Sequence, residues 1–272
     1  MPVTKLFVEG NLDIELLNPI LGGAPMLQQG GSKNSLKPRT LTEYNDYNVV
    51  ARYLRDRDFD YDPPAEISKP IVDYEKNGIP IGWRWCRHEI ENYLIEPALI
   101  GEAMKLPVND IENALRNAAS KIRDYEAARW TIGTVRRALP PHYELNTRPD
   151  TVKKEIELPS VLDATSLNDW ALSTIETYWS RFTTVTDTET VHHTFKDFIA
   201  RFDDNFIKDV CDILLWFSGK DILAGLAEWL MEKGIKNPGL FRALLRDWVI
   251  ANPERTLELL PEWKGLIEIL RV

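Results

Sequence analysis

Acidic side chains recur in the N-terminal part of the chain at positions where predicted strands end. They are Glu9, Asp13, Asp56, Asp58, Glu89 and Glu91. Carboxylates that meet at the carboxyl edge of a parallel sheet raise one another's pKa, so they stay ionised together only when a cation neutralises them. Such an oxygen-rich site suits Mg²⁺, with Mn²⁺ as a substitute. The pattern therefore predicts a magnesium-dependent phosphate chemistry.

The spacing of these acids predicts two metal sites. Asp56 and Asp58 stand two residues apart, which places both side chains on one face of an extended segment, where Glu9 would join them. Glu89 and Glu91 repeat this spacing and would complete a second site. Two cations roughly 3.5 to 4 Å apart can activate a water on one side and stabilise the leaving oxygen on the other. We therefore expect these five acids to catalyse hydrolysis of a phosphodiester.

Two further residues have alternative interpretations. Lys220 is expected to act in catalysis by stabilising the scissile phosphate, because lysine carries a compact charge on a flexible stem. It could instead cap the C-terminus of a helix after Gly219. Asp13 lies four residues beyond Glu9 and either faces the same metal ion or caps the following helix. The sequence leaves both choices open.

Composition limits the class of protein. The chain has 272 residues and a hydrophobic content of 44%, which is ordinary for a globular protein with one core and a satellite subdomain. No run approaches the roughly 18 apolar residues of a membrane span and no leader precedes the first strand, so we expect a cytoplasmic protein with no membrane partner. Cys86 and Cys211 lie too far apart in sequence to build a zinc knuckle. This excludes a zinc-binding module.

The formal net charge of -9 at pH 7 is unfavourable for nucleic-acid binding, which depends mainly on Lys and Arg. Arginines nevertheless cluster beside the acidic motifs and on one predicted helix. They are Arg52, Arg55, Arg57, Arg84, Arg87, Arg129, Arg136 and Arg137. A local basic face can hold a substrate whatever the overall charge, although solvation or pairing with acids explains such clusters equally well. A partner could also supply the missing positive charge.

Residues 1–100 alternate short apolar runs with helical patterns, as is typical of βαβ units and a mostly parallel sheet. The strands are expected at Lys5–Val8, Met26–Gln29, Val49–Arg55 and Gly82–Cys86. Helices are expected at Leu12–Leu21 and Ser35–Asp46, the second after the glycine-rich turn that contains Gly30 and Gly31. The predicted fold class is therefore α/β, with the sheet flanked by helices.

Residues 101–272 have a helical pattern and are expected to form an extended C-terminal region that packs on the α/β core. The expected helices open at the pairs Asn109/Glu112 and Ser166/Asp169, cover Phe195–Phe217, Asp221–Lys233 and Pro238–Ala251, and resume after Pro261. The side chains expected to anchor the helix after Ser166 in the core are Trp170, Leu172, Ile175 and Trp179. Pro140–Pro159 is the most loop-like stretch.

The order and context of these motifs resemble a known fold. Val8-Glu9-Gly10, then Gly30-Gly31, then a hydrophobic strand that ends in Asp56-Arg57-Asp58 resemble the Toprim fold of topoisomerases, DnaG-type primases and nucleases of the overcoming-lysogenization-defect type. His88-Glu89-Ile90-Glu91-Asn92 and Gly219-Lys220-Asp221 look like the nuclease branch, especially the stand-alone Toprim effectors of bacterial anti-phage systems. The likeness covers residues 1–100 well and the Gly-Lys motif near 220 moderately.

The resemblance implies a Mg²⁺-dependent endonuclease acting on RNA or DNA, and some relatives cut tRNA. It also implies a toxic defence effector that a separately encoded ATPase holds inactive, and it leaves a homodimer open. A second interpretation treats the acidic cluster as a structural metal or regulatory site in a larger nucleic-acid-associated assembly, which the net charge of -9 slightly favours. A primase or topoisomerase fragment is poorly supported, since neither a zinc ribbon nor a cleavage domain with its tyrosine is evident.

Other motifs carry less chemistry. His192 and His193 are adjacent, so on a helix they project in different directions and do not suit one metal ion. His88 is interpreted as a hydrogen-bonding neighbour of the acids. Ser32-Lys33 resembles a phosphate cradle, but the full P-loop pattern is absent, and the chain has no ATPase site of its own.

Overall fold

The computed structural model describes residues 2–47, 50–75, 78–141, 161 and 163–271 of the chain. The chain divides into two compact units, one formed by Met1–Glu126 with Phe202–Val272 and the other by Ala127–Arg201. The predicted boundary after residue 100 falls inside the first unit. All the acids predicted to bind metal belong to this first unit, and so does Lys220.

The first unit is built on a five-stranded sheet in the order β2-β1-β3-β5-β4. Its strands are β1 (Lys5–Val8), β2 (Met26–Gln29), β3 (Ala51–Arg55), β4 (Ile71–Tyr74) and β5 (Pro80–Arg84). β2, β1, β3 and β5 run parallel, whereas β4 pairs antiparallel with β5 at the edge of the sheet. The prediction of an α/β fold with a mostly parallel sheet is confirmed.

The predicted strands match the structure closely at the start of the chain and less well later. β1 and β2 have the predicted bounds, and β3 ends at Arg55 as expected. β5 was expected at Gly82–Cys86 but begins at Pro80 and ends at Arg84. β4, a four-residue strand at the edge of the sheet, was not predicted.

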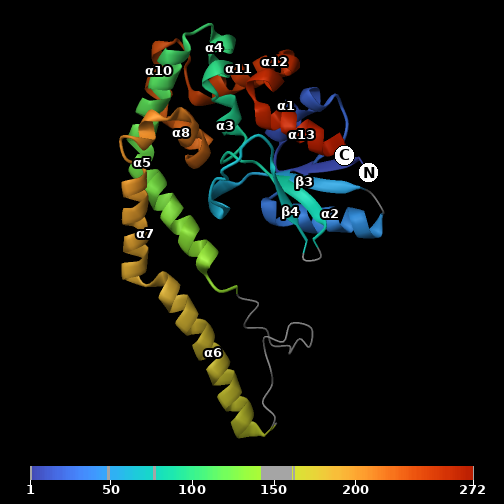
Figure 1. Cartoon of the computed structure of the whole chain (residues 1–272), viewed down its shortest axis with the longest axis vertical. Helices are drawn as coiled ribbons and strands as arrows, with labels where there is room; N and C mark the ends of the chain where they lie inside the picture. Colours follow the sequence, from blue (N-terminus) through green and yellow to red (C-terminus); the bar gives the residue numbers. More distant parts are fainter. Residues whose placement is uncertain (1, 48–49, 76–77, 142–160, 162, 272) are drawn as a thin grey trace. The chain divides into compact units, whose positions relative to one another are not determined.

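The first two helices cover opposite faces of the sheet. α1 (Asn11–Leu21) leads from β1 to its neighbour β2, and α2 (Lys33–Asp46) leads back across β1 to β3. Connections between parallel strands are right-handed. Two connections that lead in opposite directions across the sheet therefore place their helices on opposite faces. Figure 1 shows α2 on one side of the strands and α1 with α13 on the other. Phe7, Leu36 and Tyr53 pack together beneath α2.

The remaining elements of the first unit are short helices that follow the sheet and, later, return to it. They are η1 (Asp58–Asp60), α3 (Glu91–Leu94), α4 (Pro97–Met104), η3 (Phe206–Lys208), α8 (Val210–Trp216), α9 (Gly219–Gly225), α10 (Ala227–Glu232), α11 (Pro238–Ala251), α12 (Pro253–Leu259) and α13 (Pro261–Arg271). α11 packs against both α1 and α3. Residues from the last third of the chain are thereby brought to the sheet.

α5 (Val108–Ala138) runs from the first unit into the second, which also contains α6 (Ala164–Thr186) and α7 (Thr188–Arg201). α5 begins before Asn109 and α6 begins after Asp163, so neither predicted capping pair stands at its helix start. None of the described helices is both long and apolar enough to cross a membrane. Most of Pro140–Pro159, predicted as a loop, lies outside the described residues.

Two predictions about this helical region are wrong. The helix expected over Phe195–Phe217 is interrupted, since α7 ends at Arg201 and α8 begins only at Val210. The side chains of Leu172, Ile175 and Trp179, expected in the core, are exposed, and α6 has no buried residue at all. Helical spacing places Leu172, Ile175 and Trp179 on one face, but it could not show that this face stays exposed.

Candidate functional site

The carboxyl ends of β1 and β3 hold the first pair of acids. From β1 the chain continues to β2 on one side of this pair, and from β3 it continues to β4 and β5 on the other side. Ligands of open α/β sheets bind outside the carboxyl ends of the strands at such a switch point. Glu9 follows β1, and its Oε1 accepts a hydrogen bond of 3.1 Å from the backbone N–H of Asp56. Asp56 follows β3, and its Oδ1 accepts one of 3.2 Å from the N–H of Ile90. Backbone donors therefore fix one oxygen of each carboxylate.

Asp13 adds a third carboxylate from the first turn of α1. Its Oδ2 accepts a hydrogen bond of 3.0 Å from the N–H of Gly10, so the helix-capping interpretation is confirmed. The side chain is nevertheless 4% exposed and shares the electrostatic environment of Glu9 and Glu91. Burial, with the nearby charge of Glu9, raises the pKa of Asp13 to about 7. Capping therefore does not remove Asp13 from the acidic cluster.

The same environment acts on Glu9 and Asp56. Burial and then the charge of Asp58 raise the pKa of Glu9. Burial and then the charges of Asp13 and Glu9 raise the pKa of Asp56 well above its usual value. Each shift is due first to burial of the carboxyl group and then to the charges of neighbouring acids. A bound cation would lower these pKa values again.

Asp58 stands at a conformationally unusual position. Its φ is 49°, in the left-handed region that few residues other than glycine adopt, and it opens the short helix η1. The expected extended segment from Asp56 to Asp58 is therefore not present. The backbone N–H of Asp58 donates a 2.8 Å hydrogen bond to the carbonyl of His88, which holds the bend in place. Lys33 Nζ lies 2.7 Å from Asp58 Oδ2 and also pairs with Asp60.

Glu89 is held by the loop that begins α9. Its Oε1 accepts hydrogen bonds of 2.8 Å from Ser218 Oγ and from the backbone N–H of Lys220. Its Oε2 pairs with Lys220 Nζ. Lys220 thus lies in the first turn of α9, so the alternative that it caps a helix C-terminus is wrong. Burial lowers the pKa of Lys220, but Glu89 and Glu91 outweigh this effect and raise it.

Asn92 places Lys220 beside the acids. Its buried Oδ1 accepts hydrogen bonds from the backbone N–H groups of Glu89 and Gly219, at 3.1 and 3.0 Å. Its Nδ2 donates to the carbonyls of Leu214 and Phe217. A Cβ at Gly219 would lie 2.7 Å from the backbone nitrogen of Asn92, so only glycine permits this approach. The Gly-Lys pair therefore has a structural reason for each residue.

Glu91 is the most enclosed acid of the cluster, with its side chain 4% exposed. Lys220 Nζ lies 3.3 Å from its Oε2, and Arg242 Nη1 on α11 lies 3.2 Å from its Oε1. Sequence analysis named Asn92 within the motif but gave it no role, and it missed Ser218 and Arg242, the latter because no local pattern links positions so distant in the chain. For Ser218 the signal was available, since serine before a Gly-Lys helix start is a common N-cap.

The donor set suits a hard divalent cation. Ligand atoms of Asp58, His88 and Glu89 lie within 4.8 Å of one another. Carboxylate oxygens are the donors that Mg²⁺ and Mn²⁺ prefer. A bound cation would favour the ionised forms of Glu9, Asp13 and Asp56, whose pKa values burial and the neighbouring acids raise. The six predicted acids thus form one cluster through contacts and shared electrostatics.

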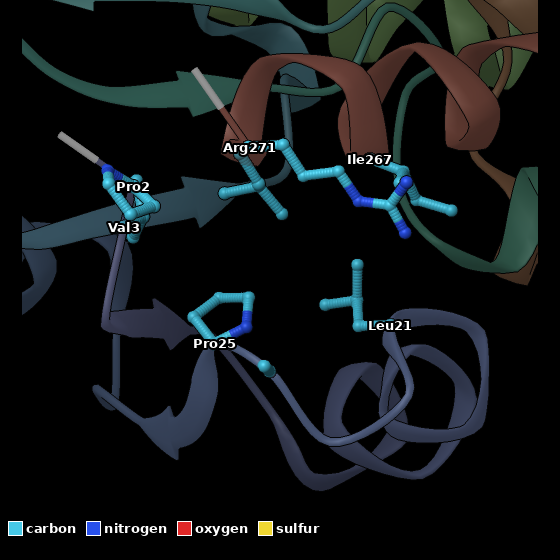
Figure 2. A pocket seen from close by; sticks show the side chains of 8 residues that line it. Pro2, Val3, Leu21, Pro25, Ile267 and Arg271 are labelled. Atoms are coloured by element: carbon cyan, nitrogen blue, oxygen red, sulfur yellow. The ribbon is translucent and has the colours of Figure 1, made fainter.

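A cavity of about 240 Å³ lies elsewhere in the first unit, among the N-terminal residues, the segment that follows α1, and α13. Figure 2 shows Leu21, Pro25 and Ile267 around it. Arg271 is the charged side chain among its described lining residues. Since no group that could react or bind a metal converges there, the carboxylate cluster remains the candidate site.

Comparisons with protein-family models, with curated proteins and with solved structures give no match. The functional interpretation therefore depends on the site itself and on the motif resemblance.

Proposed function

We propose that this protein is a Mg²⁺-dependent endonuclease with a Toprim-like core that hydrolyses phosphodiester bonds in nucleic acid. The observation that carries the proposal is the gathering of six carboxylates at the carboxyl edge of β1 and β3, where Glu9 contacts the backbone of Asp56, Asp56 contacts that of Ile90, and Asp58, His88 and Glu89 bring ligand atoms within 4.8 Å of one another. Such an arrangement costs folding free energy unless a cation binds, and a half-exposed lysine stands beside it. Metal-dependent phosphoryl transfer uses such a combination of acids that hold a metal ion and a cationic group that stabilises the phosphate.

Each group has a role that its position supports. Glu9, Asp56 and Asp58 would hold a divalent ion, and Asp13, Glu89 and Glu91 would complete its surroundings or a second position. When bound, such ions activate a water and neutralise charge on the phosphate during attack. Lys220 would donate hydrogen bonds to a non-bridging oxygen as negative charge grows there. In the attack, a bond forms between the water oxygen and phosphorus while the bond to the leaving sugar oxygen breaks.

The biological setting follows from the motif resemblance alone. We propose a toxic effector of an anti-phage system, controlled by a separately encoded ATPase, with tRNA as a candidate substrate. Purification together with an ATPase encoded beside it would support that role. An enzyme whose activity is the same with and without that ATPase would count against it.

A second candidate function keeps the metal but not the chemistry. Both oxygens of Glu89 already accept hydrogen bonds or pair with Lys220, which is the pattern of a structural acid. A Toprim-like binding or regulatory subunit of a larger assembly would be consistent with a Glu89 whose oxygens all have partners and with the net charge of -9. Such a protein would bind Mn²⁺ yet leave nucleic acid intact.

Cleavage assays on tRNA and plasmid DNA with Mg²⁺ separate the two candidates. We expect Glu9→Gln and Asp58→Asn each to reduce cleavage and cellular toxicity by at least about a hundredfold, as loss of a metal ligand usually does. Glu15→Gln is the matched control, because Glu15 also lies near the start of α1 but pairs with Arg246 outside the cluster. Unchanged cleavage in both variants would contradict the catalytic assignment.

A further inference from the structure

Arg242 stands at the open side of the carboxylate cluster. It belongs to α11, which packs against α1 and α3 and so against the elements that carry Asp13 and Glu91. Its Nη1 lies 3.2 Å from Glu91 Oε1. The Arg242 side chain is 46% exposed, whereas Glu91 is 4% exposed. The guanidinium therefore touches the buried acid at one end and solvent with the rest of its surface.

Lys220 reaches the same acid from a different helix. Its Nζ contacts the opposite oxygen of Glu91, and its side chain is 56% exposed. Two cations from two helices thus meet at one buried carboxylate, and both remain accessible from outside. A guanidinium has five N–H donors, and within the described chain Arg242 uses Nη1 alone. Its remaining donors form the planar fork that binds phosphate oxygens well.

A purely structural ion pair would look different. Arg55 and Arg84, which neutralise Asp73 in the same unit, are 14% and 16% exposed and are packed against Tyr61. Arg242 has neither that burial nor a described aromatic partner, and Glu91 already has Lys220 to neutralise it. The exposed part of the Arg242 side chain contributes little to the stability of the fold, because solvent screens its charge. Stability alone therefore gives a weak reason for Arg242 at this position.

We propose that Arg242 is a substrate-binding residue that, with Lys220, holds a phosphate of the nucleic-acid backbone above the carboxylate cluster. This inference rests on the proposed nuclease function. Lys220 and Arg242 neutralise Glu89 and Glu91 in the structure described here. Once a divalent ion neutralises these acids, both side chains can turn outward and donate to phosphate oxygens. Substrate binding is therefore coupled to metal binding through Glu91.

The test measures binding without cleavage. Fluorescence anisotropy with a labelled single-stranded RNA, and with DNA of the same sequence, would be recorded in Ca²⁺ for the full-length protein. Arg242→Gln should weaken binding about tenfold, as loss of a charge-assisted phosphate contact does, and should reduce the slope of log affinity against log salt by roughly 0.7. Arg242→Lys should lose less, because it keeps the charge but not the fork.

Arg246→Gln is the matched control. Arg246 lies one turn further along α11 and pairs with Glu15 and Asp247, neither of which belongs to the cluster. It should bind the oligonucleotide like the wild type. Mn²⁺ titration by EPR should show that Arg242→Gln binds the metal at least as tightly as the wild type, since a competing cation has been removed. That result would also show that the variant folds.

The outcomes distinguish the two proposals. If the wild type binds Mn²⁺ and oligonucleotide while Arg242→Gln and Arg242→Lys keep wild-type oligonucleotide affinity, the role of Arg242 is wrong and the nuclease proposal stands. Equal losses in Arg242→Gln and Arg246→Gln would likewise overturn a specific role for Arg242. If the wild type binds neither probe, both proposals fail together.

Discussion

Asp73 within the sheet and the carboxylate cluster at the carboxyl edge of the sheet differ in how the protein compensates their charge. Asp73 on β4 receives a 2.9 Å hydrogen bond from Tyr53 Oη, an ion pair of 2.8 Å from Arg55 and another from Arg84. The cluster around Glu9 and Asp56 has six acids, and the Lys and Arg side chains in ion-pair contact with them in the described chain are Lys33, Lys220 and Arg242.

The difference separates a structural site from a binding site. At Asp73 the cations belong to the protein and are packed in place, so the charge is balanced without a ligand. At the cluster the acids outnumber the cations, and two of those cations are half-exposed. Excess buried negative charge raises the pKa values of the carboxyl groups and lowers the stability of the fold. A protein tolerates this cost at a site where a bound ligand compensates the charge.

The largest expected effect is at the balanced site. Asp73→Asn should lower the free energy of unfolding by about 3 kcal/mol, because it leaves two partly buried guanidinium groups without their counter-ion. Urea unfolding of the whole chain measures this loss. Glu228→Gln, which breaks an exposed pair with Lys121, serves as the control and should cost less than about 0.5 kcal/mol. Similar losses in both variants would remove the distinction between the two sites.

The second effect is a dependence of stability on pH. The folded pKa of Asp13, about 7, is above its unfolded value of roughly 3.9. The folded state therefore binds more protons than the unfolded state between these values, so stability is highest at the acidic end and falls as pH rises towards 7. In metal-free protein we expect a decrease on the order of 2 kcal/mol, measured by urea unfolding at successive pH values.

Two controls identify the source of that decrease. Asp13→Asn should remove part of the decrease while keeping the acceptor for the Gly10 N–H, because Glu9 and Asp56, whose pKa values are also raised, contribute with the same sign. Glu262, whose pKa burial also raises to about 7, contributes with the same sign, so its share should persist in Asp13→Asn and disappear in Glu262→Gln. Mg²⁺ should restore stability near pH 7 in the wild type. A profile that Asp13→Asn leaves unchanged would contradict the prediction.

The third effect is a gain in stability, opposite in sign to the loss expected for Asp73→Asn. Asp56→Asn should raise the free energy of unfolding by about 1 kcal/mol at pH 8, because it removes one repelling charge and keeps the oxygen that accepts the Ile90 N–H. The same variant should lose Mn²⁺ affinity. Thermal unfolding in EDTA reports the first change. Destabilisation by Asp56→Asn would mean that the acids are balanced by groups of the protein itself.

The smallest effect concerns Lys33, which pairs with Asp58 and Asp60 and whose pKa Asp58 helps to raise despite burial. Lys33→Gln should cost less than about 1 kcal/mol of stability, as expected for a partly exposed pair. It should also tighten Mn²⁺ binding severalfold, since Lys33 no longer competes for Asp58. Isothermal titration with Mn²⁺ would detect the change, and weaker binding would argue that Lys33 orients Asp58 instead.

Much of the sheet could be predicted because its strands carry local signals. β1 and β2 are short apolar or extended runs that end just before Glu9 and Gly30, and the alternation of strands and helices along the chain predicted a mostly parallel sheet. Predictions failed where structure depends on distant partners. Trp179 has a helical apolar pattern but stays exposed, and β4 exists only because β5 offers it an edge.

The site shows the same limit. The carboxyl edge of the sheet explains why Glu9 and Asp56 meet, so their proximity was accessible from the sequence. The left-handed backbone conformation of Asp58 could not be predicted, because an aspartate that follows a strand usually adopts a more common conformation. Arg242 reaches Glu91 from a position 151 residues later, a contact that only the folded chain reveals.

Manganese binding tests the central claim, that the excess of acids is a metal site, most directly. EPR titration of the wild type and of a Glu9→Gln, Asp58→Asn double variant needs neither substrate nor partner. We expect the wild type to bind Mn²⁺ at submillimolar concentrations and the double variant to lose this binding while remaining folded. Absence of binding by the wild type at millimolar Mn²⁺, or equal binding by both proteins, would contradict the claim.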